Sequence, residues 1–114
     1  MELREAEQIL NQHSELFLRA YVYGSVARGD ADEHSDVDLV LIRDTNRPFF
    51  DRIRDVMDLV MAFGKVDISI YTEAEQRELE AEPGRYFVKD IFARGYRIEG
   101  TQSRSSPMVA TGGE

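Results

Sequence analysis

Two short apolar runs constrain the fold of this chain more than any other feature. Residues 16–23 and 37–42 consist mainly of aliphatic, aromatic and β-branched side chains, and the first run stops at Gly24. Runs of this length and composition are typical of buried strands. The segment from Gly24 to Gly29 suits a turn that leads into one helical turn, and the acidic residues 30–36 are predicted to form a loop. The chain is therefore expected to build a sheet around these two strands.

Periodic apolar residues predict helices before and after these strands. The helical spacing extends over residues 2–13, 48–63 and 86–94. In the second of these segments, Met57 and Met61 fall on the apolar side and are assigned to core packing. The helices therefore have apolar faces that can cover a sheet.

Two further strands and another helix complete the pattern. Regular alternation over residues 66–71 predicts a third strand, and residues 96–98 predict a short edge strand. Thr72 followed by Glu75 resembles a capping box that opens a helix. The sequence thus predicts the α/β (α+β) class, with a small mixed β-sheet covered by helices.

Composition indicates a single acidic domain. The 114 residues allow one domain, which we assign to residues 1–100, and residues 101–114 have the composition of a flexible tail. The formal net charge of −8 disfavours direct binding to nucleic acid. The sequence has no cysteine, which excludes disulfides, thiolate zinc sites and thiol nucleophiles. Because no membrane-spanning run or signal peptide is evident, we expect a cytoplasmic protein, and its modest core is compatible with a homo- or hetero-oligomer.

The residues suited to catalysis begin at the second strand. Asp36 and Asp38 open this strand, so their carboxylates are expected on one face, roughly 6–7 Å apart. Two carboxylates this close repel each other unless a cation lies between them, and Mg²⁺ prefers such oxygen ligands. Asp67 lies on the polar side of the third strand. It would add a third carboxylate if the two strands are neighbours.

Gly24 and Ser25 predict a phosphate-binding turn beside these carboxylates. Backbone N–H groups at the start of a helical turn can hold phosphate oxygens, and glycine allows their close approach. Two metal ions between carboxylates and phosphates form a known clamp for nucleotidyl transfer. The common alternative for an Asp-x-Asp pair is a solvated turn, but charges at the mouth of a buried strand are costly without partners. A calcium loop is rejected because the mid-loop glycine and the late glutamate are missing.

Taken together, these motifs resemble the signature of the polymerase-β-type nucleotidyltransferase superfamily, and in particular its minimal members. The signature is carried by residues 24–30 and 35–39, by Val66-Asp67-Ile68, and by the closing segment, residues 91–98. The resemblance spans residues 3–99. It implies a polymerase-β-like nucleotidyltransferase fold.

The resemblance also implies a role for each motif residue. The residues that would hold the triphosphate of ATP are Gly24, Ser25 and Arg28. The carboxylates that would bind two Mg²⁺ ions and carry catalysis are Asp36, Asp38 and Asp67. Asp67 would in addition help to deprotonate the attacking hydroxyl. For Arg28, an ion pair with a nearby aspartate is an equal alternative.

The same resemblance points to an acceptor and a partner. It implies an antitoxin that transfers AMP from ATP to a tyrosine of a HEPN-domain ribonuclease toxin, and an acidic surface suits a basic partner of this kind. One alternative is a small-molecule nucleotidyltransferase of the antibiotic-modifying kind, which usually has a second helical domain for which little sequence follows Ile98. The other is a non-catalytic antitoxin that only binds the toxin. The intact set of carboxylates argues against it.

Overall fold

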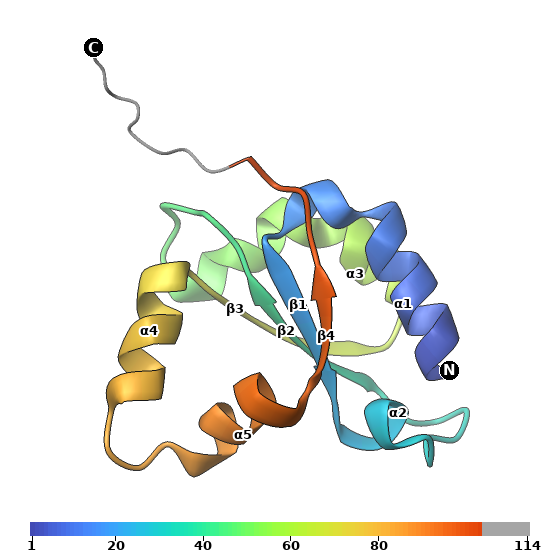
Figure 1. Cartoon of the computed structure of the whole chain (residues 1–114). Helices are drawn as coiled ribbons and strands as arrows, with labels where there is room; N and C mark the ends of the chain where they lie inside the picture. Colours follow the sequence, from blue (N-terminus) through green and yellow to red (C-terminus); the bar gives the residue numbers. More distant parts are fainter. Residues whose placement is uncertain (104–114) are drawn as a thin grey trace.

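The computed structural model describes residues 1–103 as a four-stranded sheet with helices on both faces (Figure 1). The strands are β1 Arg19–Tyr23, β2 Val37–Ile42, β3 Val66–Tyr71 and β4 Tyr96–Glu99. Their order in the sheet is β3-β2-β1-β4. Because β1 is antiparallel to β2 and β4 whereas β2 and β3 are parallel, the sheet is mixed, as the sequence predicts.

The helices lie between and beyond these strands. The α-helices are α1 Leu3–Gln12, α2 Gly24–Arg28, α3 Met57–Phe63, α4 Glu73–Ala81 and α5 Tyr86–Arg94. Two 3-10 helices, η1 Ser14–Leu16 and η2 Phe49–Val56, precede β1 and α3. The predicted helices around α1 and α5 and the helix opened by the capping box are confirmed. The first predicted strand is shorter than expected, because Leu16 belongs to η1 and residues 17–18 connect η1 to β1.

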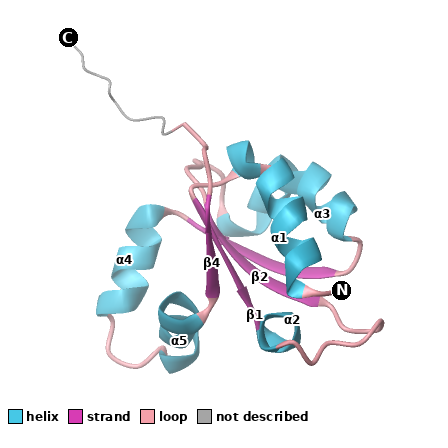
Figure 2. Cartoon of the chain, turned by 45° about the vertical axis from the view of Figure 1, so that its right-hand side comes forward, coloured by secondary structure: helices cyan, strands magenta, loops and turns pink. Residues whose placement is uncertain are grey.

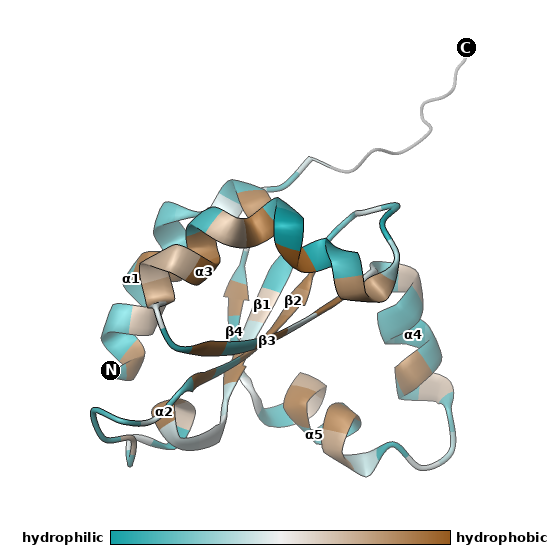
Figure 3. Cartoon of the chain, turned by 180° about the vertical axis from the view of Figure 1, so that it is seen from behind, coloured by the Kyte–Doolittle hydropathy of each residue, from teal (hydrophilic) through white to brown (hydrophobic). Residues whose placement is uncertain are grey.

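The two faces of the sheet differ in how they are covered (Figure 2). Helices α1 and α3 pack on one face and form the main core, in which Leu39 and Leu41 of β2 are fully buried. Helices α4 and α5 lie on the other face, over a smaller cluster that includes Val40 and Ile42. The two-residue period of β2 sends these pairs to opposite faces. Figure 3 shows α4 as largely hydrophilic, which fits its place at the margin of the second face.

The predicted helix over residues 48–63 is in fact two elements, and its predicted core face is wrong in part. η2 is a 3-10 helix with about 3.0 residues per turn, whereas α3 has about 3.6, so the buried face changes phase where they meet. At this junction Val56 has φ −124°. Val56 and Leu59 are consequently buried, while Met57 and Met61 are 43% and 75% exposed instead of packing in the core.

Arg52 ties η2 to the edge strand β3 and to α4. The Arg52 Nη1 donates to the Ile70 carbonyl at 2.9 Å and to Glu75 Oε1 at 2.6 Å. The guanidinium of Arg52 is the main reason that the pKa of Glu75 is lowered. Glu75 also accepts from the Thr72 backbone N–H at 2.9 Å, which confirms the predicted capping box. The outer edge of the sheet is therefore held to α4 by a buried cation.

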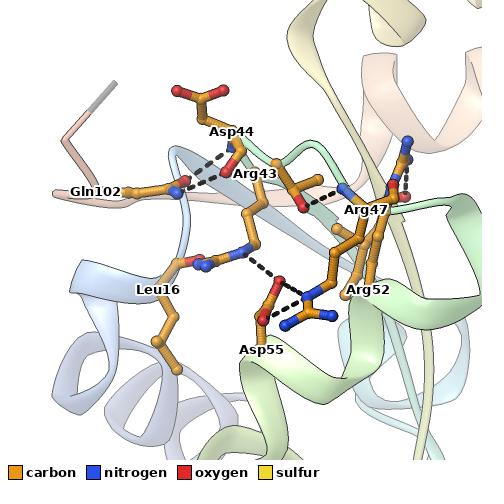
Figure 4. Close-up of polar contacts among 9 residues, drawn as sticks. Leu16, Arg43, Asp44, Arg47, Arg52, Asp55 and Gln102 are labelled. Atoms are coloured by element: carbon orange, nitrogen blue, oxygen red, sulfur yellow. Dashed lines mark hydrogen bonds and ion pairs between the residues drawn. The ribbon is translucent and has the colours of Figure 1, made fainter. Parts of the chain in front are cut away.

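A polar cluster fixes the loop at the opposite end of β2 from the carboxylates (Figure 4). Arg47 Nε donates to both carboxylate oxygens of Asp55, at 2.9 and 3.0 Å. The Gln102 side chain accepts from the Asp44 backbone N–H and donates to the Asp44 carbonyl, both at 2.9 Å. These contacts pin the β2–η2 loop and the residues after β4 to one end of the sheet.

The start of the predicted tail also contacts the domain. The Thr101 backbone N–H donates to the Ser14 carbonyl at 2.8 Å. Residues 104–114, which make up the rest of that tail, lie outside the described residues. Across residues 1–103, no helix combines the length and apolar character needed to cross a bilayer.

Candidate active site

The three predicted carboxylates lie at, or directly before, the starts of two neighbouring strands. Asp38 and Asp67 are paired residues in the parallel register of β2 and β3, so their side chains leave the sheet on the same face, from strands about 4.8 Å apart. Asp36 lies in the loop directly before β2 and is close enough for its charge to act on Asp38. Asp36 and Asp67 are exposed, and Asp38 is partly buried. The sequence predicted a third carboxylate here on the condition that the two strands are neighbours. The sheet topology meets this condition and places Asp67 beside Asp38.

Asp38 is the electrostatic centre of this group. Burial raises the pKa of its carboxyl above the ordinary value, and the charges of Asp67 and Asp36 raise it further. Arg28 acts in the opposite direction. Ionised Asp38 is therefore destabilised by its anionic neighbours, and a bound cation would relieve this repulsion.

Gly24 brings the turn between β1 and α2 against Asp38. Its backbone has φ +72°, which favours glycine, and an added Cβ would lie 2.1 Å from Asp38 Oδ2. Ser25 follows in the first turn of α2 and is partly buried. The backbone at Gly24 and Ser25 consequently lies next to Asp38, the carboxylate on which the charges of Asp36 and Asp67 act. This is the arrangement expected where phosphate oxygens and a metal ion share a site.

A cleft opens beside this turn, between α2 and α5. It has a volume of about 420 Å³ and is lined on one side by Tyr23, Gly24 and Arg28, and on the other by residues of α5. The α5 residues that line it include Phe87, Asp90 and Arg94. Sequence reasoning gave these residues no role in the site, because only the sheet brings a helix so distant in sequence back to the Gly24 turn. The sequence signal that could have indicated them is the combination of aromatic and charged side chains in the predicted helix over residues 86–94.

Arg28 forms the ion pair that was one of its two predicted interpretations, and its contact with phosphate stays a prediction. Its Nε lies 3.3 Å from Asp30 Oδ2, in an ion pair whose two side chains are well exposed. Its charge also lowers the pKa of Asp38, and its side chain lines the cleft. Exposed ion pairs of this kind contribute little to stability, so Arg28 can exchange Asp30 for a phosphate at small cost.

Tyr23 lines the cleft with an uncharged side chain. Burial raises the pKa of its phenol to about 12, with further contributions from Asp38 and Asp67. Its ring packs edge-on against Phe87, with 5.9 Å between the centroids. Tyr23 therefore packs between β1 and α5 and lines the cleft. Since the phenol stays protonated at neutral pH, Tyr23 is poorly suited to act as a base or as a nucleophile.

The donor set fits Mg²⁺ together with a nucleotide. Within residues 1–103, no group of three or more His, Cys, Asp or Glu side chains is close enough to form a metal site by itself. In phosphoryl-transfer sites, however, Mg²⁺ is usually held by one or two carboxylates and completes its shell with substrate phosphates and water. Asp38 and its two carboxylate neighbours provide such ligands next to the Gly24 turn. The residues present therefore fit a metal that binds with the nucleotide.

The comparison with protein families agrees with this geometry. The family described as "Polymerase beta, Nucleotidyltransferase" matches residues 4–85, which contain α2 and all three carboxylates. The chain therefore belongs to the polymerase beta nucleotidyltransferase family, and the predicted fold is confirmed. No curated protein matches the chain.

Two solved structures resemble the chain. The crystal structure of a "putative nucleotidyltransferase" from Sulfolobus solfataricus is 27% identical with a TM-score of 0.50, and the match covers 67% of this chain and 71% of that one. A structure named "putative minimal nucleotidyltransferase" is 26% identical with a TM-score of 0.49, over 84% of this chain and 95% of that one. The first match extends the agreement from sequence to fold.

Proposed function

We propose that the chain is a Mg²⁺-dependent nucleotidyltransferase that moves AMP from ATP to a protein hydroxyl. The acceptor we infer is a tyrosine of a cognate HEPN-domain ribonuclease toxin, so that the chain acts as the antitoxin in the cytoplasm. One observation carries the proposal: Asp67 is paired with Asp38 in the sheet and is exposed, beside a turn that a glycine brings against Asp38.

The residues divide the reaction between them. Gly24 and Ser25 hold the triphosphate through backbone N–H groups, and Arg28 offsets part of its charge. Asp36, Asp38 and Asp67 would hold Mg²⁺, which when bound would offset charge on the triphosphate and lower the barrier to attack at the α-phosphorus. Asp67 accepts the proton as the phenol oxygen forms its bond to the α-phosphorus. The bond from the α-phosphorus to the bridging oxygen breaks, and pyrophosphate leaves with that electron pair.

The surroundings of Asp67 support a macromolecular acceptor. Asp67 is exposed, so a side chain of another protein can reach it without a rearrangement of the domain. Tyr86 and Phe87, at the start of α5 beside the cleft, are 81% and 70% exposed. Exposed aromatic residues grouped next to a site are typical of protein–protein contacts. The net charge of −8 favours a basic partner, as expected for a ribonuclease.

The test uses ATP labelled at one phosphate at a time. The full chain is incubated with MgCl₂, labelled ATP and a candidate HEPN-domain acceptor protein, and the acceptor is analysed by intact mass and peptide mapping. We expect label from the α-phosphate, but none from the γ-phosphate, on a tyrosine of the acceptor. Label from the γ-phosphate would indicate phosphoryl transfer instead.

Two variants test whether transfer depends on a carboxylate of the candidate site. Asp67→Asn removes a carboxylate from the candidate site, and Asp58→Asn makes the same change on the exposed surface of α3, which covers the other face of the sheet. Transfer is expected to be lost in the first variant and kept in the second. A wild-type chain that binds the toxin without modifying it would contradict the proposal and support the non-catalytic antitoxin.

A further inference from the structure

The second wall of the cleft is formed by a helix that lies beyond the residues matched by the family model. The family match ends at residue 85, and α5 covers Tyr86–Arg94. The closing segment, residues 91–98, belongs to the resemblance, but no role in the site is assigned to the α5 residues that face Gly24 and Arg28 across the cleft. These residues include a cation, Arg94, and an anion, Asp90.

Arg94 is held loosely and is available to a ligand. Its Nε lies 3.1 Å from Asp90 Oδ1, one helical turn earlier, and the Arg94 side chain is 83% exposed. Exposed pairs at this spacing contribute little to stability, so the guanidinium can leave Asp90 for a stronger acceptor. Arg28 on the opposite wall has the same kind of exposed pairing with Asp30. The cleft is thus flanked by two arginines that can be recruited.

The position of α5 is nevertheless well defined. Ile91 is buried in the second core cluster, and Phe92 packs edge-on against Tyr21 with 5.5 Å between the ring centroids. At the end of the helix, an added Cβ on Gly95 would lie 2.5 Å from the Ile91 carbonyl oxygen. Arg94 therefore extends from a helix that is fixed to the sheet, while its own side chain is free to reorient.

The charge balance of the site calls for a second cation. Asp38, on which the charges of Asp36 and Asp67 act, lies against Gly24 of the cleft lining, in a chain with a net charge of −8. A triphosphate adds further negative charge, of which a metal ion and Arg28 offset only part. Arginine is well suited to this task, because its planar fork of donors matches phosphate oxygens.

We propose that Arg94 is a second polyphosphate ligand, which exchanges Asp90 for the terminal phosphates of the nucleotide across the cleft from Arg28. This inference rests on the proposed function, since it assumes that the cleft receives a nucleoside triphosphate. It adds the part of the site that α5 supplies.

The experiment compares ligands that differ in phosphate number. The full chain is titrated by calorimetry, with MgCl₂ present, against ATP, AMP and inorganic tripolyphosphate. For Arg94→Gln we expect affinity for ATP and for tripolyphosphate to fall about tenfold, as for the loss of one charge-assisted hydrogen bond, with AMP changed by less than about twofold. Asp90→Asn should change affinity for ATP in the opposite direction, since it frees Arg94 and removes an anion from the cleft.

The control is Arg97→Gln on β4, which removes the same charge from an arginine paired with Glu99 and absent from the cleft lining. We expect it to alter every affinity by less than about twofold. Equal losses for ATP and AMP, an equal loss in Arg97→Gln, or no loss in Arg94→Gln would each overturn the assignment. A wild-type chain that binds tripolyphosphate through Arg94 but not ATP would support this inference while contradicting the proposed function. Absence of tripolyphosphate binding to the wild-type chain overturns the inference as well.

Discussion

The two faces of the sheet are built from the same strands but serve different purposes. On the face under α1 and α3, Leu39 and Leu41 are fully buried in a continuous core. On the face under α4 and α5, the cluster is smaller, and the starts of β2 and β3 carry Asp38 and Asp67 instead of apolar residues. Because side chains alternate along β2, Leu39 points into the main core, whereas its neighbour Asp38 points to the face that carries the candidate active site.

This division explains how the domain tolerates a cluster of like charges. Burial and two neighbouring carboxylates raise the pKa of Asp38, so its ionised form lowers the stability of the fold. The main core on the other face offsets that cost by burying apolar surface. The destabilised carboxylates are then available for a cation and a nucleotide.

The largest effect on activity is expected from Asp38→Asn. We predict that transfer is abolished while the free energy of unfolding stays the same or rises slightly, because the amide removes one charge from a repelling group. A raised pKa in the folded state means that stability falls as pH increases through that pKa, and the variant should lack this part of the decrease. Transfer assays combined with urea unfolding at several pH values test this. If the variant unfolded, Asp38 would be a structural residue.

Asp67→Asn is expected to separate nucleotide binding from transfer. Loss of the proton acceptor should reduce kcat by about 10²–10⁴-fold with little change in the KM for ATP, since Asp36 and Asp38 still hold the metal. Steady-state kinetics with the acceptor protein measure both constants. Turnover close to that of the wild type would show that Asp67 is only a solvent-exposed polar residue of the edge strand and has no role in transfer.

Leu39→Ala tests the other face of the same strand. Leu39 is fully buried directly after Asp38, so its truncation should lower the free energy of unfolding by about 2–5 kcal/mol. Urea denaturation followed by circular dichroism gives this value. At temperatures where the variant remains folded, Mg–ATP affinity should be within about twofold of the wild type. A loss of stability no larger than that of Asp38→Asn would remove the contrast between the faces.

Ser25→Ala is expected to have the smallest effect. Backbone N–H groups remain to bind the triphosphate, so removal of the hydroxyl should weaken ATP binding by about two- to tenfold, the range for one net hydrogen bond. Gly24→Ala provides the contrast, because its Cβ would meet Asp38 and its backbone has a positive φ. If Ser25→Ala reduced affinity more than Gly24→Ala, the hydroxyl would be the main phosphate ligand.

The local parts of the site could be predicted from sequence, and the long-range parts could not. Gly24, Ser25, Asp36 and Asp38 lie within one strand–turn–strand unit, where spacing and side-chain period indicate which groups meet. Asp67 was predicted on the correct side of its strand, but only the β2–β3 register shows that it pairs with Asp38. The α5 wall depends on the complete sheet topology, which no local pattern encodes.

The exposed methionines show a second limit of sequence reasoning. Apolar spacing predicted one helix over residues 48–63, with Met57 and Met61 toward the core. The chain instead changes from a 3-10 helix to an α-helix near Val56, so a single helical period cannot describe both halves. The periodicity identified the apolar segment correctly, but it did not predict which of its side chains face the core.

The most direct test of the central claim is the metal dependence of ATP binding on the face that carries the carboxylates. Wild-type chain is titrated with ATP in MgCl₂ and again in excess chelator, and Asp38→Asn is titrated in MgCl₂. We predict tight binding only for the wild type with Mg²⁺, with affinity lower by at least about tenfold in the other two cases. Equal affinity in all three titrations would show that these carboxylates do not form the metal–nucleotide site.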